Sequence, residues 1–219
     1  MSVVEPVVEP EQPTVFVIDD HADVREGVKQ LVESIGLCCE VFVSPKKFLE
    51  RSPANGPSCL VLDVRLPQMS GLELQNELVR GLRHIPIIII TGHGDVPMAV
   101  RAMQAGAVGF LTKPVPDQEL LDAVYAAIEK DRVHLDAELK LRDLRVRYNS
   151  LTKREQQIVP FITAGLLNKQ IAAEVGLSEV TVKVHRAKLF AKLCTKSVPD
   201  LVRMAKALNI RANAAGPKS

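Results

Sequence analysis

Four short apolar runs in the first half of the chain each end at a polar residue suited to chemistry. The runs cover residues 14–18, 59–62, 86–90 and 108–112, and they lead into Asp19 with Asp20, Asp63, Thr91 and Lys113. Amphipathic segments separate the runs, so strands alternate with helices, and this alternation predicts a parallel sheet. Ligands of such sheets bind at the carboxyl ends of the strands. We therefore expect all four points to meet in one crevice.

The first part of the chain is expected to form an α/β doubly wound, five-stranded parallel sheet. The predicted strands are residues 14–18, 38–43, 59–63, 86–90 and 108–112. The predicted helices between them are residues 22–34, 45–50, 72–80 and 96–105. Helical spacing of Val24, Val28 and Leu31, with Gly36 as a stop, illustrates the pattern on which these helices rest.

The segment from Asp117 to Val159 contains neither glycine nor proline. Its apolar stripe continues beyond the length needed to cover the sheet, which favours one long helix over residues 117–149 that acts as a linker. A shorter helix followed by a mobile linker is the alternative.

Charge divides the chain into two parts. Residues 151–219 hold 12 Lys and Arg against 4 Asp and Glu, a net of +8, whereas residues 1–150 hold 16 against 22, a net of −6. A basic module suggests a polyanionic partner. Thr152 and Glu155 form a capping-box pattern that begins this second part, which we expect to contain three or four short helices.

Residues 168–177 and the helix that begins at Ser178 predict a helix-turn-helix. Val182, Leu189 and Leu193 form the inward stripe of its second helix. The candidate DNA contacts on the other faces are Thr181, Lys183, Val184, His185, Arg186, Ala187 and Lys188. Lysine can donate to guanine, and small apolar groups can meet thymine methyls. A solvated basic helix is the alternative interpretation.

The four strand-end points predict phosphoryl transfer. Asp63 is the candidate nucleophile, and the adjacent Asp19 and Asp20 would repel each other unless a cation lies between them. Oxygen ligands of this kind favour Mg²⁺. Lys113 would pair with the phosphoryl group, and the Thr91 hydroxyl would donate to one of its oxygens.

Other classes of protein fit poorly. The start of the chain lacks the pattern of a signal peptide, and the apolar stretch around residues 85–90 is too short to cross a bilayer. Cys38, Cys39, Cys59 and Cys194 show no metal-site spacing, so we interpret them as reduced and mostly packed thiols. A cytoplasmic protein is expected.

Residues 14–130 resemble a bacterial response-regulator receiver domain, which has the CheY-like fold. The resemblance rests on Asp19-Asp20, Asp63 before the loop 66–72, Thr91-Gly92 and Lys113-Pro114. It implies that Asp63 accepts phosphate from a histidine kinase. It also implies a Mg²⁺ bound by Asp20, Asp63 and the backbone carbonyl of Arg65, and by Asp19 through water.

The same resemblance implies a switch. Thr91 would move toward the phosphate, and Phe110, at the position of the aromatic switch residue, would turn inward. The peptide bond before Pro114 is implied to be cis. Residues 91–100 are similar to those of the FixJ-like subgroup, which suggests a homodimer through the face of the fourth helix and fifth strand on phosphorylation.

Residues 151–155, 165–172 and 181–186 resemble the LuxR/NarL-type DNA-binding domain. Pro160 departs from the pattern and should kink the first helix of this domain. Leu167, where a small residue is common, would contact a partner or simply pack. The expected domains are a disordered leader (1–13), a receiver core (14–116), the last receiver helix extended as linker (117–149), the DNA-binding domain (150–210) and a flexible tail (211–219).

The resulting hypothesis is a transcription factor activated by phosphorylation, whose partners are a sensor kinase, promoter DNA and RNA polymerase. It would catalyse only its own phosphorylation and dephosphorylation. A stand-alone phosphotransferase with an aspartyl-phosphate intermediate and a constitutive DNA binder are the alternatives. The intact acidic pair, Thr91 and Lys113 count against the constitutive binder.

Overall fold

The computed structural model describes residues 12–52, 54, 56–81 and 84–211. The expected leader lies outside the described residues except for its last two, and so does the expected tail except for Arg211. The chain divides between Leu135 and Asp136 into two compact units, and each is described by itself.

The first unit contains the five-stranded parallel sheet that the sequence predicts, in the order β2-β1-β3-β4-β5. Its strands are β1 (Thr14–Ile18), β2 (Cys38–Phe42), β3 (Ser58–Asp63), β4 (Ile87–Thr91) and β5 (Gly109–Thr112). Its helices are α1 (Ala22–Ser34), α2 (Pro45–Leu49), α3 (Gly71–Arg80), α4 (Val96–Gln104) and the first part of α5 (Asp117–Asn149). The doubly wound fold is confirmed.

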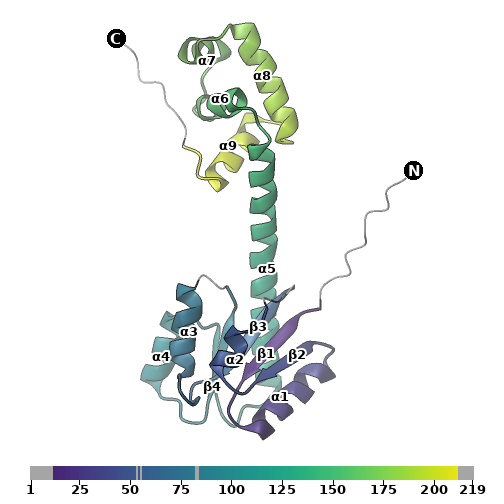
Figure 1. Ribbon diagram of the computed structural model, residues 1–219, viewed down its shortest axis with the longest axis vertical. Helices are drawn as coiled ribbons and strands as arrows, with labels where there is room; N and C mark the ends of the chain where they lie inside the picture. Colours follow the sequence, from purple (N-terminus) through teal and green to yellow (C-terminus); the bar gives the residue numbers. More distant parts are fainter. Residues whose placement is uncertain (1–11, 53, 55, 82–83, 212–219) are drawn as a thin grey trace, which may run out of the picture. The chain divides into compact units, whose positions relative to one another are not determined.

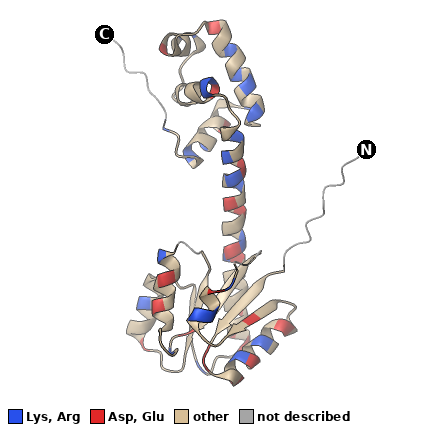
Figure 2. Ribbon diagram, viewed as in Figure 1, with Lys and Arg blue, Asp and Glu red and all other residues tan. Residues whose placement is uncertain are grey.

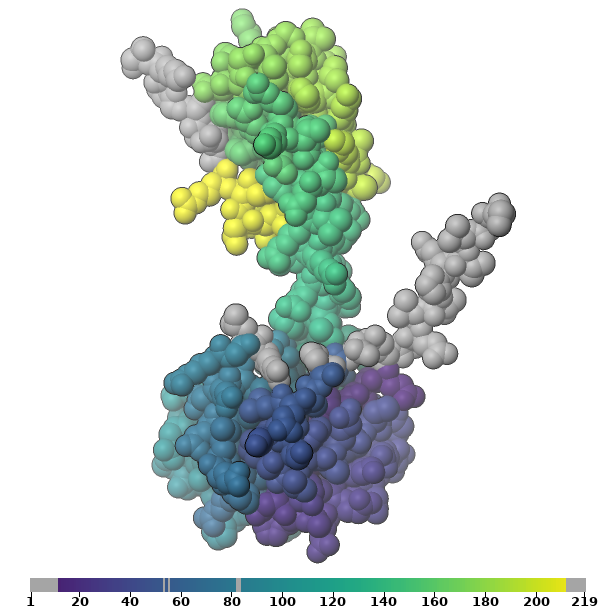
Figure 3. Space-filling view, in the orientation of Figure 1, coloured from purple at the N-terminus to yellow at the C-terminus, as the bar shows by residue number. Residues whose placement is uncertain are grey.

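Helices cover both faces of the sheet (Figure 1). On one face, α1 and α5 enclose a core built around Val32, Val124 and Ile128. On the other face, α2, α3 and α4 enclose a core that includes Phe48 and Leu74. In Figure 3, residues of α2 and α3 lie at the surface turned to the viewer. Every residue of β3 is buried, because this strand is central and has helices on both sides.

The carboxyl end of β3 is connected to α3 by a tightly packed loop. Ser70 caps the helix, accepting from the amide of Glu73 while the Glu73 carboxylate accepts from the Ser70 amide. A Cβ placed on Gly71 would come within 2.3 Å of the carbonyl oxygen of Asp63. Glycine at this position therefore lets the loop lie directly against the strand end.

Helix α5 is continuous over 33 residues. Within the first unit its buried Asp131 accepts from the amide of Ser58 at 2.7 Å, and it lies 3.1 Å from Nδ1 of His84. Asp131 thus supplies a hydrogen-bond acceptor to a buried backbone donor at the start of β3. Within the second unit, Leu144 and Tyr148 pack against that unit's core.

The second unit is helical. It contains α6 (Lys153–Thr163), α7 (Asn168–Val175), α8 (Glu179–Lys192) and α9 (Val198–Ala207). The predicted capping box is confirmed, since Thr152 and Glu155 exchange side-chain-to-backbone hydrogen bonds. Pro160 lies inside α6, and the helix runs through it to Thr163. Gly176 ends α7 with a φ of 67°, a left-handed conformation suited to glycine.

The prediction that the cysteines are mostly packed is wrong for two of them. All four thiols are free, but Cys38 and Cys194 are exposed. Cys38 lies on β2, an edge strand, and Cys194 follows the end of α8. Cys59 is buried and Cys39 is half-buried, and burial raises the pKa of the Cys39 thiol to about 12. None of the helices within the described residues is both long and apolar enough to span a membrane.

Candidate functional site

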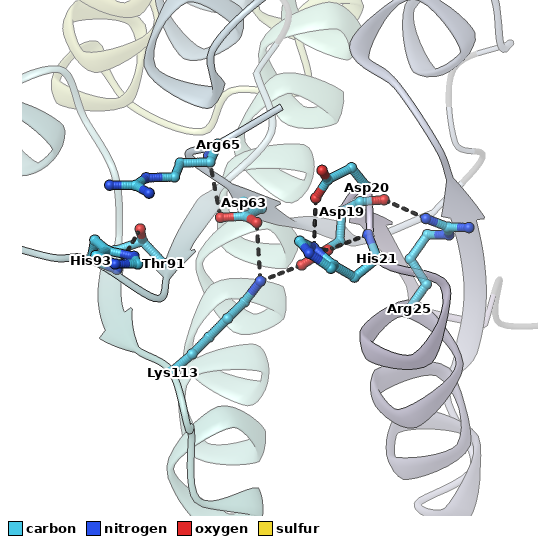
Figure 4. A network of polar contacts seen from close by, with 9 residues as sticks. All are labelled: Asp19, Asp20, His21, Arg25, Asp63, Arg65, Thr91, His93 and Lys113. Atoms are coloured by element: carbon cyan, nitrogen blue, oxygen red, sulfur yellow. Dashed lines mark hydrogen bonds and ion pairs between the residues drawn. The ribbon is translucent and has the colours of Figure 1, made fainter. Parts of the chain in front are cut away.

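An ion-pair cluster joins the carboxyl ends of three strands (Figure 4). The Nζ atom of Lys113, after β5, lies 2.5 Å from Oδ2 of Asp19 and 3.0 Å from Oδ2 of Asp63. Asp19 follows β1, and Asp63 is the last residue of β3. Both carboxylates are almost completely buried, whereas the Lys113 side chain retains 21% exposure. The ammonium therefore neutralises charge that the sheet has withdrawn from water.

The surroundings of Lys113 keep it charged. Burial by itself would lower the pKa of the ammonium, but the hydrogen bonds to Asp19 and Asp63 act in the opposite direction and the pKa lies above its ordinary value. The peptide bond from Lys113 to Pro114 is cis.

Hydrogen bonds that involve the backbone fix the chain around Asp19 and Asp63. The Arg25 guanidinium, from α1, donates to the carbonyl oxygen of Asp19 at 2.7 Å. The amide of Arg65 donates to Oδ1 of Asp63 at 3.3 Å. The amide of Gly71 donates to the carbonyl of Val64 at 2.9 Å, which closes the loop that follows the strand.

Asp20 and His21 complete the acidic part of the cluster. Nδ1 of His21 lies 2.7 Å from Oδ1 of Asp20 and 3.3 Å from Oδ1 of Asp19. Ligand atoms of Asp19, Asp20, His21 and Asp63 all lie within 4.8 Å of one another. The Lys113 ammonium contacts two of these carboxylates, and the Arg25 guanidinium contacts a backbone oxygen, so the three carboxylates leave an excess of negative charge. A divalent cation fits this donor set, because hard cations take carboxylate oxygens.

Thr91 lies beside this cluster, and Phe110 lies on the neighbouring strand β5. Thr91 is buried at the end of β4, and its hydroxyl accepts from the amide of His93 at 3.3 Å. Phe110 is half-buried on β5. A Cβ on Gly94 would come within 2.9 Å of the Phe110 ring. The loop after β4 thus touches the aromatic side chain that the resemblance to receiver domains implies is a switch.

The second candidate site is the surface of α8. Val182, Leu189 and Leu193 are buried, as their spacing predicts. Of the candidate DNA contacts, four are exposed and three are half-buried; the exposed ones are Lys183, Val184, Ala187 and Lys188, and the half-buried ones are Thr181, His185 and Arg186. Figure 2 shows basic residues along most of α8.

One predicted DNA contact also has a partner inside its own unit. The Arg186 guanidinium donates to Oδ1 of Asn168, the first residue of α7, at 3.1 Å. This bond fixes the two helices of the motif relative to each other at the end where α7 begins.

Sequence reasoning missed two residues of the first site, His21 and Arg25. His21 directly follows the acidic pair, so its position in the chain was the available signal. Arg25 lies one helical turn beyond His21. Its hydrogen bond to the Asp19 carbonyl leaves no pattern in the sequence, because every residue has a backbone carbonyl and the acceptor is therefore not marked by a residue type.

Comparisons with known proteins agree with this architecture. Residues 15–125 match the response regulator receiver domain, and residues 149–205 match the bacterial regulatory proteins of the luxR family. Nodulation protein W of Bradyrhizobium diazoefficiens is 49% identical over 199 residues, which make up 91% of this chain and 88% of that protein. Transcriptional regulatory protein FixJ of Rhizobium meliloti is 43% identical over 193 residues, 88% of this chain and 94% of that protein.

Solved structures lead to the same group. The response regulator StyR matches with a TM-score of 0.80 at 46% identity, covering 89% of this chain and 98% of that one. Full-length FixJ from B. japonicum matches with a TM-score of 0.53 at 37% identity, covering 90% of this chain and 97% of that one. With a receiver domain followed by a LuxR-type DNA-binding domain, the chain belongs to the bacterial response regulators that control transcription.

Proposed function

We propose that this response regulator is switched by phosphorylation of Asp63 and then binds paired DNA half-sites as a dimer. The observation that carries the proposal is the joint contact of Lys113 with Asp19 and Asp63 in an acidic crevice. This arrangement supplies a nucleophile and a fixed cation beside it, which are the parts that phosphoryl transfer to a carboxylate requires.

The donor in the cell would be a phosphohistidine of a sensor histidine kinase. An oxygen of Asp63 forms the new P–O bond, the P–N bond breaks, and the imidazole leaves with the electron pair. Lys113 then pairs with the phosphoryl oxygens, and the Thr91 hydroxyl turns from the His93 amide to donate to one of them. The chain would act as an enzyme only in its own phosphorylation and dephosphorylation.

Mg²⁺ is the expected cofactor. Asp19, Asp20, Asp63 and the carbonyl of Arg65 would hold it, directly or through water. When bound, the ion neutralises charge on the phosphoryl oxygens during transfer.

Dimerisation would use the face of α4 and β5. Three apolar side chains of α4 support this assignment, because Val96, Val100 and Met103 are 76%, 48% and 48% exposed. Movement of Thr91 and an inward turn of Phe110 would reshape this face and shift a pre-existing equilibrium toward the dimer.

On DNA, α8 would enter the major groove. Lys183 and Lys188 offer charge, and Val184 and Ala187 offer small apolar contacts. The residues proposed to line this surface also include Thr181, His185 and Arg186. RNA polymerase is a further proposed partner, and the cytoplasm is the proposed location. The proposed domain limits are those expected from the sequence: receiver core 14–116, linker helix 117–149 and DNA-binding domain 150–210.

The first experiment compares the intact masses of wild type and Asp63→Asn after incubation with Mg²⁺ and a small acyl phosphate. The expected result is one phosphoryl group on wild type and none on the variant. Asp136→Asn, which alters an exposed carboxylate on α5, is the matched control and should be phosphorylated like wild type. Equal modification of wild type and Asp63→Asn would show that the acceptor is another residue.

The second experiment links phosphorylation to DNA. Phosphorylated wild type should sediment as a dimer and bind a two-half-site DNA more tightly than the unphosphorylated protein. If Lys183 contacts a DNA phosphate, Lys183→Ala should weaken binding to all DNA sequences alike. The slope of log affinity against log salt concentration should then become smaller in magnitude by about 1. If Asp63→Asn bound DNA and activated transcription fully, the protein would be a phosphorylation-independent regulator.

A further inference from the structure

His21 places a nitrogen atom among the carboxylates of the receiver site. Its Nδ1 atom lies 2.7 Å from Oδ1 of Asp20 and 3.3 Å from Oδ1 of Asp19. The backbone amide of His21 also donates to Oδ1 of Asp19 at 2.8 Å, which fixes the start of the side chain. Figure 4 shows the imidazole beside both aspartates, on the side of the cluster away from Thr91.

These distances suit two ligands of one metal ion. A six-coordinate ion with bonds of about 2.1 Å places neighbouring ligand atoms roughly 3 Å apart. The separations of Nδ1 from the two carboxylate oxygens, 2.7 and 3.3 Å, bracket that spacing. The oxygens of Asp19 and Asp63 that bind Lys113 are their Oδ2 atoms, so the Oδ1 atom of Asp19 that faces His21 is a different one.

Exposure allows the imidazole to take this role. The His21 side chain is 68% exposed, and that of Asp20 is 34% exposed, so a hydrated cation can reach both from solvent. Asp19 and Asp63 lie deeper, at 0% and 5%. The site therefore has an open, mixed oxygen and nitrogen side and a closed, all-oxygen side.

We propose that His21 supplies an imidazole ligand to the divalent cation of this site, and thereby favours nitrogen-preferring transition metals such as Co²⁺, Ni²⁺ and Zn²⁺. The inference rests on the proposed metal-dependent function of the same crevice. Imidazole suits the later transition metals, whereas Mg²⁺ takes oxygen ligands and keeps its waters. His21 thus sets which metal competes for the crevice without being needed for Mg²⁺.

The test uses the full-length chain and Co²⁺. A coordinated imidazole gives a strongly shifted, solvent-exchangeable ring N–H resonance in the proton NMR spectrum of the Co²⁺ protein. Wild type should show this resonance, and His21→Gln should lack it. His93→Gln removes the other imidazole near the site and is the matched control, which should keep the resonance.

Binding titrations give the second readout. The Co²⁺ affinity of His21→Gln should fall at least about tenfold, since loss of even an outer partner of a metal ligand costs tenfold to hundredfold. The Mg²⁺ affinity should stay unchanged. An equal loss for both metals would show that His21 only orients Asp20, and a resonance that persists in His21→Gln would assign the ligand elsewhere; either result overturns the inference.

The two proposals fail in different ways. Mg²⁺ binding to wild type without a shifted imidazole resonance in the Co²⁺ protein would overturn the role of His21 alone. Wild type that binds neither Mg²⁺ nor Co²⁺ would overturn the metal-dependent function and the role of His21 with it.

Discussion

The ammonium of Lys192, near the end of α8, lies 2.7 Å from a carboxylate oxygen of Glu155 in α6. The Glu155 side chain is 2% exposed, and the same oxygen accepts from the Thr152 amide at 2.8 Å. One carboxylate thus caps α6 and also holds α8, the helix proposed to enter the major groove, against α6. This gives the basic helix a role in packing in addition to its proposed role on DNA.

Lys192→Met should destabilise the second unit. Removing the ammonium leaves the buried carboxylate without its charged partner and should lower the free energy of unfolding by about 2 kcal/mol. The loss is smaller than for a fully buried ion pair because Lys192 is partly exposed. Amide hydrogen exchange of α6 and α8 in the full-length chain measures the effect. Lys188→Met, on the same helix but exposed, is the control. Equal acceleration of exchange in both variants would show that general charge on α8 matters and not this pair.

The same carboxylate predicts a dependence on pH. Burial by itself would raise the pKa of Glu155, but the hydrogen bonds from Lys192 and Thr152 prevail and the pKa lies below its ordinary value. Its stabilising contribution is therefore complete above the unfolded pKa of about 4.3 and is lost as pH falls below that value. Unfolding free energies of wild type and Glu155→Gln should converge over this range. A constant difference between them would contradict the assigned direction.

Gly71→Ala should disturb the position of Asp63. The new Cβ would lie 2.3 Å from the Asp63 carbonyl oxygen, and this clash is with backbone, which cannot move aside as a flexible side chain can. The overlap should lower the free energy of unfolding by about 3 kcal/mol. This loss exceeds the roughly 1 kcal/mol of stability that alanine contributes over glycine within a helix. Urea unfolding and the rate of phosphorylation would both report it. Gly27→Ala, in α1 with open space around its Cβ, should instead stabilise.

Gly94→Ala should bias the position of Phe110. The added methyl would lie 2.9 Å from the Phe110 ring and from the Thr112 side chain, so the ring must move. We expect a cost of about 1–3 kcal/mol and a changed monomer-dimer equilibrium. Phe110→Ala in the same chain should recover part of that cost in a double-mutant cycle. Gly92→Ala, where a Cβ meets nothing, is the matched control from the same loop. If the effects of Gly94→Ala and Phe110→Ala on the free energy of unfolding were additive, the two positions would not be coupled.

Local patterns predicted most of the fold. The apolar runs before Asp19, Asp63 and Thr91 are buried strands, because parallel strands enclosed by helices must be apolar on both faces. The capping box at Thr152 was also visible, since its two partners are three residues apart. The same spacing at Ser70 and Glu73 was available and overlooked.

Features that depend on strand order were not predictable from local sequence. Cys38 is exposed because β2 is an edge strand, and the order of strands is not a property of residues 38–42. Asp131 was invisible for a similar reason. It lies in a charged helix, and its burial depends on Ser58 and His84, which are 73 and 47 positions away in sequence.

The bond between Lys113 and Asp19 also bears on the order of folding, because the two residues are 94 positions apart. The first strand cannot bury its aspartate with a charged partner until the last strand has been synthesised and has joined the sheet. Contacts this distant slow folding, whereas contacts such as those between α7 and α8 form locally. A ribosome that stalled between the fourth and fifth strands would therefore expose a receiver with an uncompensated acidic core, a natural substrate for chaperones and proteases.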